Sequence, residues 1–309
     1  MNKNIKKFIG LCKQTQKALK GILVEFLKAN GYNPIVDDGY IYAPGVEPVC
    51  VTAHLDTVHT ETVKEVHVVK GSISSPQGIG GDDRCGVYMI MELVRQGLRP
   101  YILFCEDEEI GGIGSEKFVD TKHLDEVAKG IKFFIELDRA NEDDLVYYND
   151  DNKEFHKWCE KVTGYREATG SFSDISNLCP EAGISGVNIS CGYYRAHTLQ
   201  EFVVWDEMLN SIKATRKLIE AARELEKPWE YMAKKFEFKG FSNRRYLDDY
   251  IFIAVDGTSY IEYGETPEEA VGSLMMNNPD LRWNDIIDYY NMYDYEYYME
   301  KGEKGVEVI

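Results

Sequence analysis

The chain contains five apolar runs of strand length, and residues with helical patterns lie between them. Strands that alternate with helices are typical of a mostly parallel sheet covered by helices on both faces. We therefore expect an α/β fold with such a central sheet. The apolar runs are Val49–Ala53, Val66–Val69, Tyr101–Cys105, Phe133–Leu137 and Val187–Ile189. The clearest helical patterns are Gly86–Gln96, Glu154–Val162 and Trp205–Leu225.

Polar side chains that can do chemistry follow four of these runs. His54-Leu-Asp56, the acidic run Glu106–Glu109 and Asp138 each come directly after a strand, and His197 lies a few residues after the last one. In parallel sheets, functional side chains gather at the carboxyl ends of the strands. Each of these residues is ordinary when taken alone. Together, histidines and carboxylates in this placement are the ligands of a two-metal site, because zinc binds imidazole nitrogen and carboxylate oxygen.

Two glycine-containing segments strengthen this interpretation. The segment Gly78-Ile-Gly-Gly-Asp82-Asp83-Arg-Cys-Gly86 predicts a tight loop that presents an aspartate at the start of a helix, although a simple Asp cap would look the same. Four acidic residues at 106–109 repel one another unless cations balance them. The glycines that follow them indicate a close approach of the backbone to another group.

In their order and residue pattern, these motifs resemble those of the co-catalytic di-zinc exopeptidases. That superfamily includes peptidase T and related tripeptidases, desuccinylases, glutamate-releasing carboxypeptidases and zinc aminopeptidases. The resemblance covers roughly residues 20–225. The matching segments are His54-Leu-Asp56, Asp82-Asp83-Arg-Cys-Gly86, Asp107-Glu108-Glu109-Ile-Gly-Gly, Asp138 and His197-Thr-Leu-Gln-Glu201.

The resemblance implies which residues hold the metals. Asp82 would bridge both ions. His54 and Asp138 would complete the site of one ion, and Glu109 and His197 that of the other. The cofactors implied are two divalent metal ions, with Zn²⁺ as the first choice and Co²⁺ or Mn²⁺ as alternatives.

The resemblance also implies two catalytic roles. Glu108 would be the general base that takes a proton from the metal-bound water and delivers it to the leaving amine. Asp56 would orient the His54 ring through its second nitrogen. Gly170-Ser-Phe-Ser-Asp174 is similar to a loop that lies at the substrate cleft in these families, and Tyr193 or Tyr194 is a candidate for an oxyanion hydroxyl.

The sequence departs from peptidase T and the desuccinylases in one respect. Their inserted lid domain lies between the positions of Asp138 and His197, and these two residues are too close in this sequence to accommodate it. The compact plan is nearer that of the zinc aminopeptidases.

The function expected is therefore that of a zinc-dependent exopeptidase acting on short peptides, as an aminopeptidase or a tripeptidase-like enzyme. One alternative is an amidohydrolase of the deacylase or desuccinylase type, with an N-acyl amino acid as substrate. Another is a non-catalytic binding protein on the same scaffold. Intact Glu108 and Asp56 argue against the last, because a binding protein has no need of an unligated base.

The chain is expected to divide near Pro228, which ends a long charged helical pattern. Residues 1–227 would form the catalytic domain, and residues 228–309 a small C-terminal α+β appendage of ββα type with a Tyr-rich acidic tail that can serve as an oligomer contact. The elements expected in it are strands Tyr250–Val255 and Ser259–Tyr263 joined at Asp256-Gly257, a helix opening at Thr266-Pro267, and a helix pattern over Trp283–Met299.

Charge and cysteine content limit the partners and the cellular compartment that we expect for this protein. A formal net charge of −18 argues against nucleic acid and anionic membranes as partners, because phosphate contacts come from Lys and Arg. The sequence has no apolar stretch near the about 20 residues of a spanning helix, and no signal peptide is recognisable. Seven cysteines with scattered spacing do not predict a disulfide framework. We expect a cytoplasmic protein.

Overall fold

The computed structural model describes residues 2–234, 248–254, 259–264, 274–275, 278 and 286–291. The chain divides into two compact units, Met1–Lys235 and Phe236–Ile309, and each is described by itself. The helices of the first unit are α1 (Lys3–Cys12), α2 (Gln16–Ala29), α3 (Gly81–Arg95), α4 (Ile113–Val119), α5 (Lys122–Gly130), α6 (Lys153–Thr163), α7 (Ile175–Ala182) and α8 (Trp205–Ala222).

The first unit is built on an eight-stranded sheet with the order β1-β2-β6-β3-β7-β10-β8-β9. The four central strands, from β6 to β10, run parallel to one another, and antiparallel strands lie outside them. The strands are β1 (Ile35–Asp37), β2 (Tyr40–Ala43), β3 (Glu47–His54), β6 (Pro100–Cys105), β7 (Phe133–Arg139), β8 (Asp144–Val146), β9 (Arg166–Glu167) and β10 (Gly186–Ser190). The predicted mostly parallel α/β sheet is confirmed.

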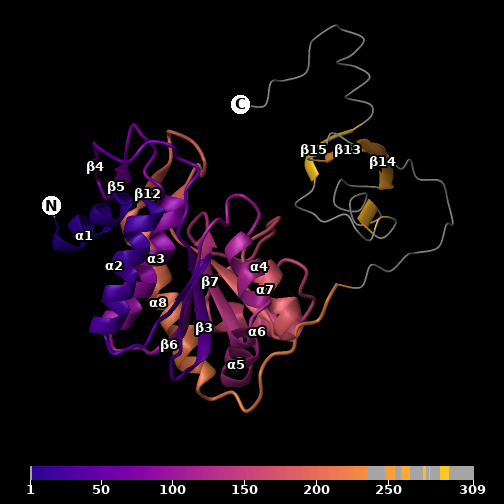
Figure 1. The fold of residues 1–309 in the computed structure, drawn as a ribbon, viewed down its shortest axis with the longest axis horizontal. Helices are drawn as coiled ribbons and strands as arrows, with labels where there is room; N and C mark the ends of the chain where they lie inside the picture. Colours follow the sequence, from indigo (N-terminus) through magenta and orange to yellow (C-terminus); the bar gives the residue numbers. More distant parts are fainter. Residues whose placement is uncertain are drawn as a thin grey trace, which may run out of the picture. The chain divides into compact units, whose positions relative to one another are not determined.

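Helices cover both faces of this sheet, as expected (Figure 1). One core contains buried side chains of α1, α2, α3, α6 and α8 together with one face of the sheet. The other core contains those of α4, α5 and α7 with the opposite face. Because β3 and β7 are buried on both faces, their central residues are mostly apolar and do not alternate with polar ones, apart from the buried Thr52 and Glu136.

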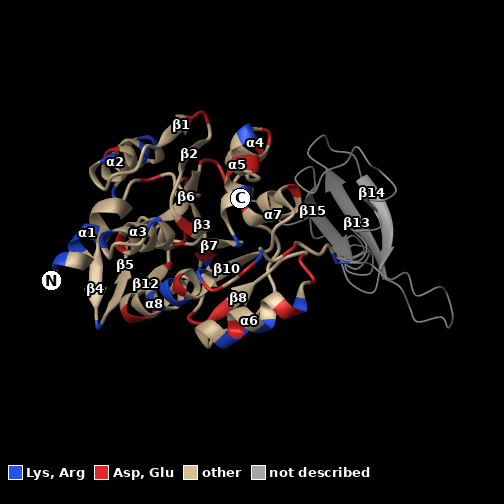
Figure 2. Cartoon of the chain, turned by 90° about the horizontal axis from the view of Figure 1, so that it is seen from below, with Lys and Arg blue, Asp and Glu red and all other residues tan. Residues whose placement is uncertain are grey.

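The first 30 residues form two helices, α1 and α2. The break follows α1, and Thr15 caps α2 by accepting a hydrogen bond at its hydroxyl from the Ala18 N–H, at 3.3 Å. After α2, Gly31 adopts a φ of +80°, which stops the helix. Exposed lysines cover the outer sides of both helices (Figure 2). No helix of the described residues is long and apolar enough to cross a bilayer.

A smaller antiparallel sheet has the strand order β11-β12-β5-β4. It pairs β12 with β5, two segments that are far apart in the sequence. The loop from β11 to β12 carries His197, so this sheet fixes both ends of that loop. The strands are β4 (His67–Val69), β5 (Ser72–Ser74), β11 (Tyr193–Tyr194) and β12 (Phe202–Val204).

The residues after Pro228 are part of the first unit for a short distance. The Ser185 N–H donates to the Trp229 carbonyl at 2.9 Å, and Glu230 forms a β-bridge with Ile184. The Trp229 ring packs on Phe155, with ring centroids 5.8 Å apart. The predicted appendage over 228–309 stays a prediction, and in the described structure the residues that follow Pro228 pair with other residues of the first unit.

The second unit contains a three-stranded antiparallel sheet with the order β14-β13-β15. Strands β13 (Asp248–Ala254) and β14 (Ser259–Gly264) confirm the predicted strand pair. The helix pattern over Trp283–Met299 is wrong for residues 286–291, which form β15 (Ile286–Asn291). Its Ile-Ile-Asp-Tyr-Tyr sequence has the β-branched and aromatic residues that favour a strand. The Asp256-Gly257 turn and the helix opening at Thr266 lie outside the described residues.

We predict that Gly86→Ala destabilises the protein strongly. A Cβ at position 86 would lie 2.0 Å from the Leu137 carbonyl oxygen and 3.0 Å from the Ala53 Cβ, so α3 would have to move away from β7. The expected loss in the free energy of unfolding, measured by urea denaturation, is about 3 kcal/mol or more. The matched control is Gly21→Ala within α2, where nothing lies within 4 Å of the new Cβ. That variant should gain about 0.5–1 kcal/mol, and equal effects of the two variants would contradict the prediction.

Candidate metal centre

The side chains predicted to bind metal meet at the carboxyl edge of the central strands. His54 is the last residue of β3, and Asp138 lies at the end of the neighbouring strand β7. Glu109 belongs to the loop that follows β6, on the other side of β3. Asp82 lies in the first turn of α3, and His197 in the loop between β11 and β12.

The first group of possible ligands consists of His54, Asp82 and Asp138. The His54 Nε2 lies 3.1 Å from Asp138 Oδ1 and 4.0 Å from Asp82 Oδ1. One ligand atom from each of the three residues lies within 4.8 Å of the others. His54 itself is only 1% exposed, so its ring is held in place by packing.

The second group consists of Asp82, Glu109 and His197. The His197 Nε2 lies 2.9 Å from Asp82 Oδ2 and 3.1 Å from Glu109 Oε2. Two ligand atoms that are each ~2 Å from one ion, at a near-tetrahedral angle, lie a little over 3 Å apart. Asp82 belongs to both groups, and each of its two oxygens faces a different group. This is the arrangement of a bridging carboxylate.

Protonation states in the metal-free centre also favour cations there. Hydrogen bonds to Asp82 and Glu109 raise the pKa of His197 to about 11. Although burial alone would lower it, the carboxylate of Asp138 raises the pKa of His54 well above its usual value. The Glu109 Oε1 atom is buried and has no hydrogen-bond partner among the described residues. These residues fit a pair of divalent ions, which would replace the protons on the two imidazoles.

Asp56 stands behind the first histidine. Its Oδ1 lies 3.3 Å from His54 Nδ1 and accepts the Glu108 N–H at 3.0 Å, while its Oδ2 accepts the Glu109 N–H at 3.0 Å. Burial raises the pKa of Asp56, but these hydrogen bonds outweigh it and the net shift is downward. One carboxylate thus fixes the ring orientation of His54 and the start of the loop that carries two of the predicted site residues.

Glu108 belongs to neither of these groups. Burial and the neighbouring carboxylate of Asp138 raise the pKa of Glu108 to about 10 in the metal-free centre. A nearby pair of divalent cations would lower that pKa again, because they favour the charged carboxylate.

Sequence reasoning missed the residue that holds Asp82 in place. Glu201 is fully buried, and its Oε1 accepts the Asp82 N–H at 2.9 Å while its Oε2 lies 3.1 Å from the His59 Nε2. The acidic residue after His197 was a recognisable part of the motif, but nothing in the sequence marked His59 as its partner.

Three further side chains hold Asp138. The Ser173 hydroxyl donates to Asp138 Oδ2 at 2.8 Å, and the Asn188 Oδ1 accepts the Asp138 N–H at 3.0 Å. The Tyr193 hydroxyl donates to the Asp138 carbonyl oxygen at 3.0 Å, and the Tyr194 hydroxyl donates to Glu207. Both hydroxyls have partners in this structure, and the role of either tyrosine as an oxyanion donor stays a prediction.

A third set of ligand atoms, from His54, Asp83 and Glu109, also lies within 4.8 Å. Asp83 Oδ1 is 4.0 Å from the Nδ1 of His54, the nitrogen that faces Asp56. In this third set the His54 ring faces Asp83 with its Nδ1, whereas in the first set it faces Asp138 with its Nε2.

The comparison with protein families identifies one match. Residues 42–177 match the profile of Peptidase family M28, and this segment contains the motifs from His54 to Asp138. No curated protein matches the chain.

Several solved structures share the fold. Aminopeptidase PepT from Bacillus cereus is 14% identical, with a TM-score of 0.59, and a tripeptidase from Staphylococcus aureus is 14% identical, with a TM-score of 0.58. An aminopeptidase from Desulfurococcus kamchatkensis is 11% identical, with a TM-score of 0.54. Each match covers 72% of this chain and 98% of the other. The resemblance to the co-catalytic zinc exopeptidases is confirmed, and with it the class of enzyme, a metal-dependent peptidase.

We predict that the two ligand groups lose metal in different ways. After zinc reconstitution and dialysis, the wild-type protein should hold about two zinc ions per chain. His197→Ala removes a ligand of one group and should lower the content toward about one ion, while Asp82→Ala removes the shared ligand and should lower it well below one.

The control for this measurement, by elemental analysis, is Asp38→Ala, which removes an exposed carboxylate outside the centre. The order of the two variants is the critical result: a greater loss in His197→Ala than in Asp82→Ala would remove Asp82 as the bridging ligand.

Proposed function

We propose that this zinc-dependent peptidase is an aminopeptidase of short peptides and that it works with two metal ions. The observation that carries the proposal is the position of Asp82, whose two oxygens face two different sets of ligands. His54 and Asp138 complete one set, and Glu109 and His197 the other. A carboxylate shared in this way would hold both ions of a two-metal hydrolase.

The chemistry divides between the metals and the chain. Two zinc ions bound in this centre would supply Lewis acidity for the scissile carbonyl and would lower the pKa of a bound water toward ~7. Glu108 is the residue that takes up a proton and donates it to the leaving amine, because its carboxyl group is buried beside the centre but belongs to neither ligand set with Asp82. Asp56 is a positioning residue, since it contacts His54 and the backbone that carries Glu108.

Peptides are favoured as substrates for two reasons. The similar structures named above are those of two aminopeptidases and a tripeptidase. The described chain between Asp138 and His197 is a run of short elements from β8 to β11, with no inserted lid domain. The side chain of His197 is 54% exposed, so the centre is open to solvent and to the end of a peptide. The alternative substrate class is an N-acyl amino acid.

We predict that the zinc-loaded protein hydrolyses di- and tripeptides with a free amino terminus. The same peptides with an acetylated amino terminus should be cleaved at least ~10²-fold more slowly, the scale on which an enzyme rejects an analogue that leaves site groups unpaired. The measurement is kcat/KM for matched free and acetylated peptides and for N-acyl amino acids. Faster cleavage of the N-acyl compounds would assign the protein to the deacylases instead.

We predict that Glu108→Gln keeps the zinc content but lowers kcat by at least ~10²-fold, the usual effect of losing a general acid–base group. The matched control is Asp107→Asn, one residue earlier, which makes the same acid-to-amide change. Asp107 has a φ of +60°, which Asn tolerates, and its carboxylate accepts a hydrogen bond from Gln16 rather than facing the ligands. Near-normal turnover in Glu108→Gln would exclude Glu108 as the base.

A further inference from the structure

The loop between β11 and β12, residues 195–201, carries His197 and is mostly exposed. Glu201 is the one residue of this loop that is buried. The Thr198 hydroxyl donates to the Arg195 carbonyl at 2.8 Å, and the Glu201 N–H donates to the Thr198 carbonyl at 3.1 Å. These hydrogen bonds shape the loop but do not connect it to the rest of the first unit. Its polar connection to that unit therefore depends on the side chains of His197 and Glu201.

His197 cannot hold the loop in place by packing. Its φ of +63° lies in the left-handed region, which non-glycine residues adopt only where surrounding contacts hold them there. Its side chain is 54% exposed, and its ring contacts the carboxylates of Asp82 and Glu109 with one nitrogen. The strained and exposed position of this ligand requires an anchor elsewhere in the loop.

Glu201 provides that anchor through two partners. Its Oε1 accepts the Asp82 N–H at 2.9 Å, and its Oε2 lies 3.1 Å from the His59 Nε2. Since a carboxylate can only accept, the imidazole nitrogen is the donor of the second hydrogen bond. Loss of His59 would leave one oxygen of a fully buried carboxylate without a partner, which is costly.

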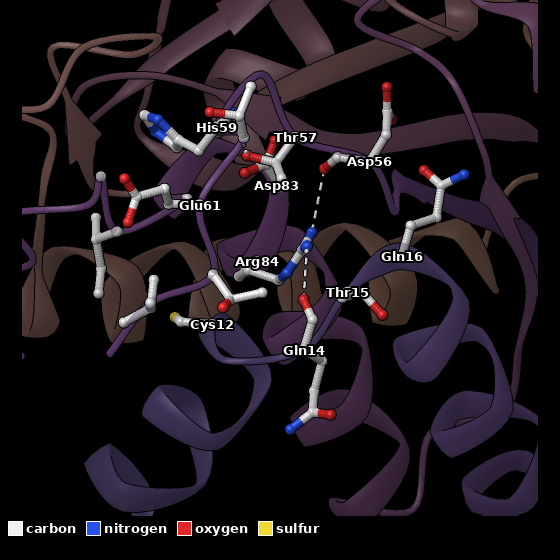
Figure 3. A pocket seen from close by; sticks show the side chains of 16 residues that line it. Cys12, Gln14, Thr15, Gln16, Asp56, Thr57, His59, Glu61, Asp83 and Arg84 are labelled. Carbon is white, nitrogen blue, oxygen red and sulfur yellow. Dashed lines mark hydrogen bonds between the residues drawn. The ribbon is translucent and has the colours of Figure 1, made fainter. Parts of the chain in front are cut away.

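His59 comes from the loop after β3 and is fixed from its other side by a glycine. Its ring lies so close to Gly78 that a Cβ at that position would be 2.3 Å from the His59 Cε1. The ring also lines a cavity of about 320 Å³, where Figure 3 shows it beside Thr57 and Asp83. Because part of its surroundings is open, the contacts with Gly78 and Glu201 set the position of the ring.

We propose that His59 is a positioning residue that anchors the loop of His197 through Glu201. The ligand group of Asp82, Glu109 and His197 depends on this loop, whereas the group of His54, Asp82 and Asp138 contains no residue from it. The shared Asp82 is also held within α3. Loss of His59 should therefore weaken one ion more than the other. This effect on the ions rests on the two-metal function proposed above, but the anchor itself does not.

The first test is a titration of the metal-free, full-length protein with Co²⁺, followed by its visible absorption. The variants are His59→Asn, whose amide is too short to reach Glu201, and His59→Gln, which is one methylene longer and keeps an N–H near the Nε2 position. In His59→Asn the second binding step should be at least ~10-fold weaker, because a hydrogen bond to a buried carboxylate is lost. The first step should be unchanged, and His59→Gln should restore the second.

Three further variants interpret this titration. His197→Ala removes a ligand of the second group, so its remaining step identifies the first ion. Gly78→Ala pushes the His59 ring away while its donor is intact, and it should also weaken the second step. The control is His67→Asn, the same change in a half-exposed histidine that pairs with Glu65 at 2.8 Å. Equal weakening of both steps, or no recovery in His59→Gln, would overturn the proposal.

The second test measures the anchor without any metal. Arg195 is exposed in the loop, and trypsin cleavage after it reports how often the loop opens. In the metal-free protein, this cleavage should be ~10-fold faster in His59→Asn than in the wild type or His67→Asn. Equal rates would overturn the anchor. A wild type that binds a single Co²⁺ ion would contradict the two-metal function instead, and the digestion would still decide the role of His59.

Discussion

The crowding of carboxylates at the carboxyl edge of the sheet is the constraint on which the rest of this structure depends. Asp82, Glu109 and Asp138 each have at least nine-tenths of their side chain buried, and the positive groups among them are two histidines. Two like charges ~4 Å apart repel by about 4 kcal/mol at an effective dielectric constant of ~20. The arrangement therefore favours cations there. Asp56 differs from the others because backbone N–H groups and the His54 ring satisfy it.

The start of α3 combines several of the features that position these carboxylates. The helix begins after Gly80 in the left-handed region, without a side-chain cap of its own. The cap comes instead from Glu201, a residue 119 positions later, which accepts the Asp82 N–H. Negative charge is also favourable at a helix N-terminus. The helix dipole therefore lowers the free-energy cost of a negative charge on Asp82 or Asp83. Four residues further on, Gly86 lets the same helix lie against β7.

The sequence predicted the sheet from short-range patterns, and it predicted the five candidate ligands from these patterns together with the resemblance to the zinc exopeptidases. Apolar runs of strand length, followed at once by His54, Asp138 and the acidic run, place side chains at one edge without any knowledge of the tertiary structure. What it did not predict depends on long-range contacts. The pairing of Glu201 with His59, and the engagement of Tyr193 with the Asp138 carbonyl, join segments whose distance in space no local pattern encodes. Residues 286–291 carry both helical spacing and strand composition, and pairing with β13 decides between them.

The position of the ligands along the chain gives the centre an order of assembly during synthesis. His54, Asp82 and Asp138 all leave the ribosome before His197, and the strand that carries Asp138 pairs directly with the one that carries His54. The first ligand group can therefore form while the chain is still being made, since nascent chains fold from the N-terminal side. The second group waits for the loop between β11 and β12, which also brings the cap of α3 at Glu201. A chain that ends before residue 197 would carry the three residues of the first group but would lack both His197 and Glu201, the residue that holds Asp82 in place.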